Sequence, residues 1–134
     1  ELHGDVHLLP TLIAETTFDM VRGALKRSGL ALPRIPPMRF IAGLRQQRGA
    51  FQGGGEVLVA ARQDRVFGEE TPTDGYALLK LFASYSFHRT GLVHTVTVRV
   101  DNLANERYRN HLSYVKDLVP EMGRDIRVIY SLRF

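Results

Sequence analysis

Histidine and carboxylate side chains stand close together near the C-terminus, at His111, Asp117 and Glu121. Imidazole nitrogens and carboxylate oxygens are common metal ligands, so these three residues are the candidate site for a metal ion or its chelate. Solvated side chains of a surface loop are the commoner explanation of such a group. The sequence leaves both explanations open.

A second pair of histidines, His3 and His7, flanks Asp5 at the start of the chain. Alternate residues of a strand share one face, so the two imidazoles would lie on the same side and could converge on a metal. A polar strand face without a ligand is the simpler explanation, and we expect it to hold.

Asp101, Asn102, Asn105 and Glu106 also form a polar group. Asparagine and aspartate commonly end strands and close turns through side-chain to backbone hydrogen bonds, so we predict a structural role for them.

The sequence lacks the motifs of common catalytic and phosphate-binding sites. Gly53-Gly54-Gly55 is not followed by lysine and serine or threonine, as a phosphate-binding loop would be. No serine stands in a Gly-x-Ser-x-Gly context. We therefore expect no enzyme activity and no resident cofactor.

Composition narrows the remaining possibilities. The chain has 134 residues, 44% of them apolar, no cysteine and a formal net charge of +4. It contains no run of about 18 apolar residues, the length that a membrane-spanning helix needs. Its basic residues are scattered, which argues against a nucleic-acid partner. The chain opens on Glu-Leu-His-Gly without a signal peptide, so we expect a cytosolic protein or the tail of a longer precursor.

Apolar and polar residues alternate along most of the chain, which is typical of strands with one apolar and one polar face. Long and short connections also alternate, with the long ones at 23–37, 64–75 and 102–123. These patterns predict an all-β antiparallel meander of about seven strands: Leu2–Leu8, Thr11–Arg22, Met38–Arg48, Phe51–Gln63, Tyr76–Phe87, Leu92–Asp101 and Arg124–Phe134.

The alternation also predicts which side chains share a face. One face should be apolar and carry Leu79, Leu81, Val96, Val98, Val128, Tyr130 and Leu132. The other should be polar and carry Arg45, Glu56, Lys80, Arg99, Arg127 and Arg133. An outer-membrane barrel turns its apolar face to lipid and its polar face to the lumen, whereas a soluble ligand-binding barrel does the reverse. We expect the first arrangement because all the long connections fall at one end.

Four segments resemble the C-terminal part of TonB-dependent outer-membrane receptors. Leu32-Pro33-Arg34-Ile35-Pro36-Pro37 resembles a loop-to-strand segment of that family, and Thr73-Asp74-Gly75-Tyr76 resembles the start of one of its strands. Val100 to Tyr108 is similar to a third segment, and the chain ends on the aromatic Phe134. Together these segments cover about residues 32–134.

The resemblance implies that residues 1–134 are the C-terminal strands of a transmembrane barrel of about 22 strands, unclosed in this chain. The family's plug domain and signal peptide are absent from this sequence. The implied function is active transport across the Gram-negative outer membrane of a metal chelate, such as a ferric siderophore. Zinc, haem or a cobalamin would also fit. The alternatives are a passive or structural outer-membrane barrel and a soluble ligand-binding barrel.

The resemblance also implies partners. They are outer-membrane lipid, the TonB complex acting through the missing plug, the small metal chelate, and the barrel-assembly machinery. This machinery would read the aromatic terminus, so Phe134 is the expected assembly signal.

Overall fold

The computed structural model describes residues 1–134 and contains one sheet of seven strands and no helix. The strands are β1 (Leu2–Leu9), β2 (Leu12–Asp19), β3 (Arg39–Arg48), β4 (Phe51–Ala60), β5 (Tyr76–Arg89), β6 (Leu92–Asp101) and β7 (Asp125–Arg133). Each strand runs antiparallel to its neighbours, in the order β1 to β7. The predicted meander is confirmed, and the sheet is open because β1 and β7 each pair on one side only.

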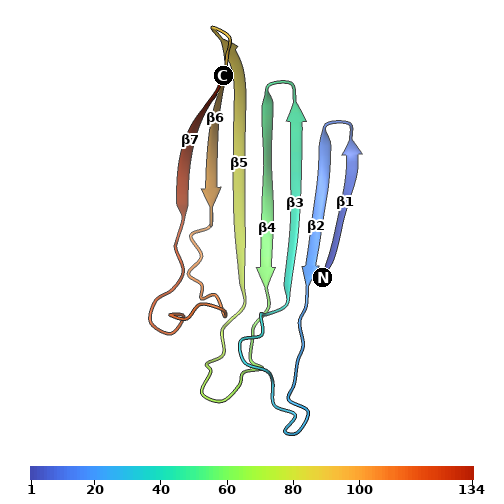
Figure 1. The fold of residues 1–134 in the computed structure, drawn as a ribbon, viewed down its shortest axis with the longest axis vertical. Coiled ribbons are helices and arrows are strands. Elements are labelled where there is room, and N and C mark those ends of the chain that lie inside the picture. The colour runs from blue at the N-terminus through green and yellow to red at the C-terminus, as the bar shows by residue number, and fades with distance from the viewer.

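Short turns and long loops lie at opposite ends of the sheet (Figure 1). Tight turns join β1 to β2, β3 to β4 and β5 to β6, and Gly49 and Gly91 in two of them have positive φ angles of 57° and 77°. Glycine adopts this left-handed conformation without a steric penalty. The loops 20–38, 61–75 and 102–124 all lie at the other end, so the predicted alternation of connections is confirmed.

Two strands end three residues earlier than predicted. β2 and β4 end at Asp19 and Ala60 rather than at Arg22 and Gln63. The hydrogen-bonded ladders β2–β3 and β3–β4 both stop at Arg39, the first residue of β3. Two prolines lie shortly before this residue, and proline has no amide hydrogen with which to extend a ladder.

The three successive glycines of β4 are explained by their neighbours within the sheet. A Cβ atom at Gly54 would lie 2.4 Å from the carbonyl oxygen of Leu44 and 2.8 Å from the ring of Phe82. Gly53 is similarly covered by the ring of Phe51, and Gly55 by the side chain of Leu81. Side chains of the flanking residues therefore occupy the space above these glycines.

The register separates the predicted apolar and polar sets onto opposite faces. Directly opposed residues of an antiparallel pair point to the same side, and Val96 opposes Tyr130 while Arg99 opposes Arg127. The apolar face has no second layer above it, so Val128 is 70% exposed and Ile126 is 62% exposed. The structure contains no membrane-spanning helix.

Candidate functional site

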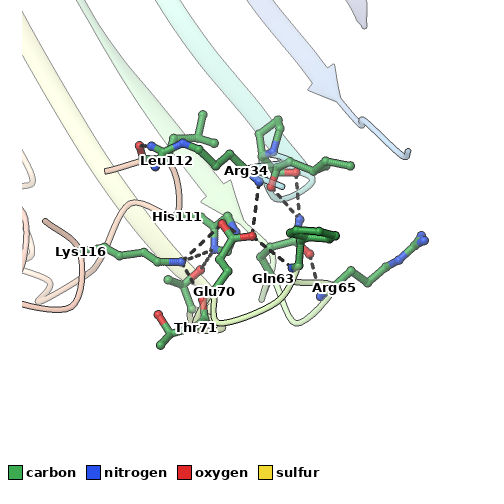
Figure 2. Close-up of polar contacts among 12 residues, drawn as sticks. Arg34, Gln63, Arg65, Glu70, Thr71, His111, Leu112 and Lys116 are labelled. Carbon is green, nitrogen blue, oxygen red and sulfur yellow. Dashed lines mark hydrogen bonds and ion pairs between the residues drawn. The ribbon is translucent and has the colours of Figure 1, made fainter. Parts of the chain in front are cut away.

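A carboxylate from one long loop connects all three long loops at their common end (Figure 2). Glu70, in the β4–β5 loop, accepts hydrogen bonds at Oε2 from the backbone N–H of Arg34 at 3.3 Å and of Phe67 at 3.4 Å. Its Oε1 lies 3.2 Å from Nε2 of His111 and 3.9 Å from Nζ of Lys116. Arg34 belongs to the β2–β3 loop, and His111 and Lys116 belong to the β6–β7 loop.

The hydrogen bonds around His111 indicate its protonation state. Its side chain is fully buried, and Nδ1 lies 3.0 Å from the hydroxyl of Thr73 and 3.4 Å from Nζ of Lys116. An ammonium group has only hydrogens to donate, so Nδ1 acts as the acceptor. The neutral ring then carries its hydrogen on Nε2, which faces the carboxylate of Glu70.

The surroundings of these groups shift both pKa values downward. Burial lowers the pKa of His111, the charges of Lys116 and Arg34 lower it further, and Glu70 opposes the shift. Burial alone would raise the pKa of Glu70. The N–H groups of Arg34 and Phe67, the positive charge of Lys116 and that of His111 when the imidazole is protonated bring the pKa of Glu70 below its usual value. A neutral imidazole beside an ionised carboxylate is therefore the favoured state.

Further contacts surround this group. Arg34 donates to the carbonyl oxygen of Leu112, and its guanidinium lies 3.6 Å from the ring centroid of Tyr114. Lys116 Nζ donates to the carbonyl oxygen of Thr71 at 2.6 Å. We call Arg34, Glu70, Thr73, His111 and Lys116 the loop clasp.

The three metal candidates do not meet. His111 belongs to the loop clasp, whereas Asp117 accepts a hydrogen bond from the hydroxyl of Thr71 at 2.5 Å. The backbone N–H of Glu121 bonds to the carbonyl oxygen of Tyr108. No group of three or more histidine, cysteine, aspartate or glutamate residues in the structure could hold a metal ion. At the other end of the chain, His3 pairs with Thr17.

The polar group at 101–106 has the structural role predicted for it. The side chain of Asn102 is buried and donates to the carbonyl oxygens of Glu106 at 2.8 Å and Met122 at 3.4 Å. Its Oδ1 accepts the N–H of Glu106, while Asn105 accepts the N–H of Arg124. These contacts join the two ends of the β6–β7 loop.

The six side chains predicted to lie on the polar face do share one face of the sheet: Arg45, Glu56, Lys80, Arg99, Arg127 and Arg133. The register places many of the charges on this face in two adjacent rows. The row nearer the loops contains Asp5, Glu15, Glu56, Lys80, Asp101 and Asp125, and the next row contains Arg45, Phe82, Arg99 and Arg127. Ion pairs join Glu15 to Arg45 at 2.5 Å and Glu56 to Lys80 at 2.8 Å, and Asp101 to Arg127. Arg99 forms no ion pair and borders a hollow of about 330 Å³ on this face.

Of the five residues of the loop clasp, only His111 could be named as a candidate from the sequence. Arg34, Glu70 and Lys116 come from three loops, and the hydrogen bond between the first two spans 36 residues. Arg34 and Thr73 stand in motifs that were interpreted only as segments leading into strands. No local spacing brings these residues together, so the sequence contains no pattern that could have revealed the group.

Comparisons with known proteins agree with this architecture. Residues 11–103 match the family described as TonB dependent receptor-like, beta-barrel. A solved structure of the copper transporter OprC superposes with a TM-score of 0.80 at 23% identity, a likeness that shows the fold. The match covers 96% of this chain and 22% of that one, so the chain spans less than a quarter of its length. No curated protein matches. The family match covers most of the chain, which therefore belongs to the TonB-dependent receptor-like β-barrels.

Proposed function

We propose that this chain forms part of the wall of an active transporter in the Gram-negative outer membrane, which imports a small metal chelate with energy delivered through TonB. The observation that carries the proposal is the division of a single-layered sheet of this family into one uncovered apolar face and one charged face. In a barrel wall, the apolar face would contact lipid, and the polar face with Arg45, Glu56, Lys80, Arg99, Arg127 and Arg133 would line the lumen.

The open edges of the sheet support a larger barrel. β1 and β7 each have one unpaired edge, and an open edge inside a membrane leaves backbone groups without hydrogen-bond partners. We propose that residues 1–134 are the C-terminal barrel strands, closed by strands of the same receptor outside this sequence. A plug domain outside this sequence would supply the contact with TonB.

The charge of the polar face favours an anionic cargo. Most carboxylates there are paired with cations, whereas Arg99 and Arg133 form no ion pair. Unpaired cations favour the approach of anions, so a negatively charged metal chelate is the proposed substrate. The similar structure is, by its name, a copper transporter. A copper chelate is therefore a substrate to test beside ferric siderophores, zinc, haem and cobalamins.

Uptake by cells carrying the full-length receptor tests the proposal. The receptor would be produced in a strain that lacks its own receptors for the chelates, and uptake of radiolabelled iron, copper and zinc chelates would be measured with and without TonB. We expect saturable uptake of at least one chelate only when TonB is present. Uptake without TonB would favour a passive barrel, and a monomer soluble without detergent would favour a soluble ligand-binding barrel.

A further inference from the structure

We infer that the three long loops form one lid that opens and closes as a single unit, with Glu70 as the positioning residue that holds it closed. Polar contacts of the loop clasp join the three loops to one another (Figure 2). The placement of this lid over the outer mouth of a transporter rests on the proposed function, whereas the coupling among the loops does not.

Glu70 is the connection because its carboxylate contacts both of the other loops. Oε2 is bound by the backbone N–H of Arg34 in the β2–β3 loop. Oε1 faces Nε2 of His111 and Nζ of Lys116 in the β6–β7 loop. Arg34 in turn donates to the carbonyl oxygen of Leu112, which connects the β2–β3 and β6–β7 loops directly. Each loop is therefore bound to the other two.

Burial makes this coupling cooperative. The side chain of His111 has no exposed surface, and those of Lys116 and Glu70 are 7% and 14% exposed. If the β4–β5 loop moved alone, Lys116 would lose the carboxylate of Glu70 and the carbonyl oxygen of Thr71, and His111 would lose the hydroxyl of Thr73. Charged and polar groups that lose their partners must regain them from water, so the β6–β7 loop should rearrange as well until Lys116 and His111 reach water. Partial opening is thus less stable than either the closed lid or the fully open lid.

The base of the lid is held by contacts that do not involve Glu70. Asn102 joins the two ends of the β6–β7 loop, and Gln63 pairs with Thr73 across the base of the β4–β5 loop. The Gln63 side chain also donates to the carbonyl oxygens of Ile35 and Pro36 in the third loop. Loss of Glu70 should therefore release the outer parts of the loops and leave the strands folded.

Hydrogen–deuterium exchange of the full-length receptor in detergent tests the coupling. In Glu70→Gln we expect peptides from 20–38, 61–75 and 102–124 to exchange faster together than in the unchanged receptor. The increase should be about tenfold, because a buried group that loses a charged hydrogen-bond partner is destabilised by this order of free energy. Peptides from β3 to β6 should keep their rates. The matched control is Glu69→Gln, because Glu69 is an exposed neighbour in the same loop. Faster exchange confined to 61–75, or the same change in the control, would overturn the inference.

A second pair of variants separates the orphaned charge from a general loss of structure. Lys116→Met should accelerate the same three loops, which keeps the test decisive if Glu70→Gln fails to fold. In the double variant Glu70→Gln/Lys116→Met both charges of the Glu70–Lys116 pair are removed, so neither is left without its partner. Exchange at 20–38 and 102–124 should therefore be slower than in Glu70→Gln alone. A double variant with exchange as fast as the sum of the single effects would contradict the inference.

Chelate uptake measured on the same variants distinguishes this inference from the proposed function. Coordinated exchange in a receptor that imports nothing would contradict the transport proposal and leave the coupled lid intact. Independent exchange of the three loops in a receptor that imports a chelate through TonB would contradict the coupled lid and support the transport proposal.

Discussion

His111 gives the loop clasp a pH dependence that can be measured. Its pKa lies below the ordinary value of 6.5, so the closed clasp binds fewer protons than the open one as the pH falls past 6.5. Glu70 acts in the same direction below its ordinary value of 4.5, because its pKa is also lowered. Clasp stability should be constant above pH 6.5 and fall on acidification. Exchange rates of residues 102–124, measured between about pH 3.5 and 7.5 and corrected for the intrinsic pH dependence of amide exchange, would check this.

A His111→Asn variant isolates the histidine. It should remove the part of the pH dependence between 6.5 and 4.5 and keep the part below 4.5 that belongs to Glu70. If the variant titrates as the unchanged receptor does, then His111 is not the group responsible.

Asn102 should be the most sensitive single residue of the β6–β7 loop. Asn102→Ala removes three hydrogen bonds and places alanine at a φ of 51°. We expect a loss of about 2–4 kcal/mol in the free energy of unfolding, from unsatisfied buried groups and left-handed backbone strain. Urea unfolding of the full-length receptor in detergent measures it. Asn102→Gly relieves the backbone strain but does not restore the hydrogen bonds, so it should recover only a part of the lost unfolding free energy.

Phe134 is the proposed assembly signal, and its role can be separated from ligand binding. The ring is fully exposed at the turn end of the sheet, away from the loops. Phe134→Ala should reduce the amount of heat-modifiable folded barrel in the outer membrane several-fold and leave ligand affinity of the folded fraction unchanged. Arg133→Ala is the neighbouring control for barrel yield. Normal assembly of Phe134→Ala would contradict both the assigned role and the orientation of the barrel.

At the scale of the strand, the glycines of β4 set how closely β3, β4 and β5 approach one another. Gly54→Ala would place a Cβ atom 2.4 Å from a backbone oxygen of β3 and 2.8 Å from the Phe82 ring. Backbone cannot move aside as a flexible side chain does, so we expect a loss of about 1–3 kcal/mol in unfolding free energy. Gly4→Ala in β1 is the control, since its Cβ would meet only Thr16 Cγ2 at 3.9 Å. Equal stability of the two variants would contradict this packing.

At the scale of the whole molecule, two adjacent residues of β7 test which face contacts lipid. Val128 lies on the apolar face and Ile129 on the polar face, and both are exposed in this structure. In the full-length receptor Val128→Arg should cost about 2–4 kcal/mol of folding free energy, as arginine does on the lipid face near the bilayer midplane. Ile129→Arg should be tolerated. The reverse result would place the apolar face inside the barrel and favour the soluble alternative.

The strands, their antiparallel order, the alternation of turns and loops, and the two faces could all be predicted from the sequence. The strands and their two faces follow from an alternation of apolar and polar residues with a period of two, which is visible in any short segment. The alternation of turns and loops follows from the lengths of the segments between the strands. The ends of β2 and β4 were predicted three residues too late. Both strands end where β3 begins, and the prolines just before β3 determine that point.

The places where charges meet could not be predicted from the sequence. The two rows of charged residues on the polar face depend on the register of all seven strands, and a shift of one residue would have moved each set to the other face. The loop clasp needs contacts between loops far apart in sequence, such as the 36-residue separation of Arg34 and Glu70. His111 was found as a candidate from its type alone. Its partners Glu70, Thr73 and Lys116 are fixed by the folded sheet that brings the three loops to one end, and no local pattern contains that information.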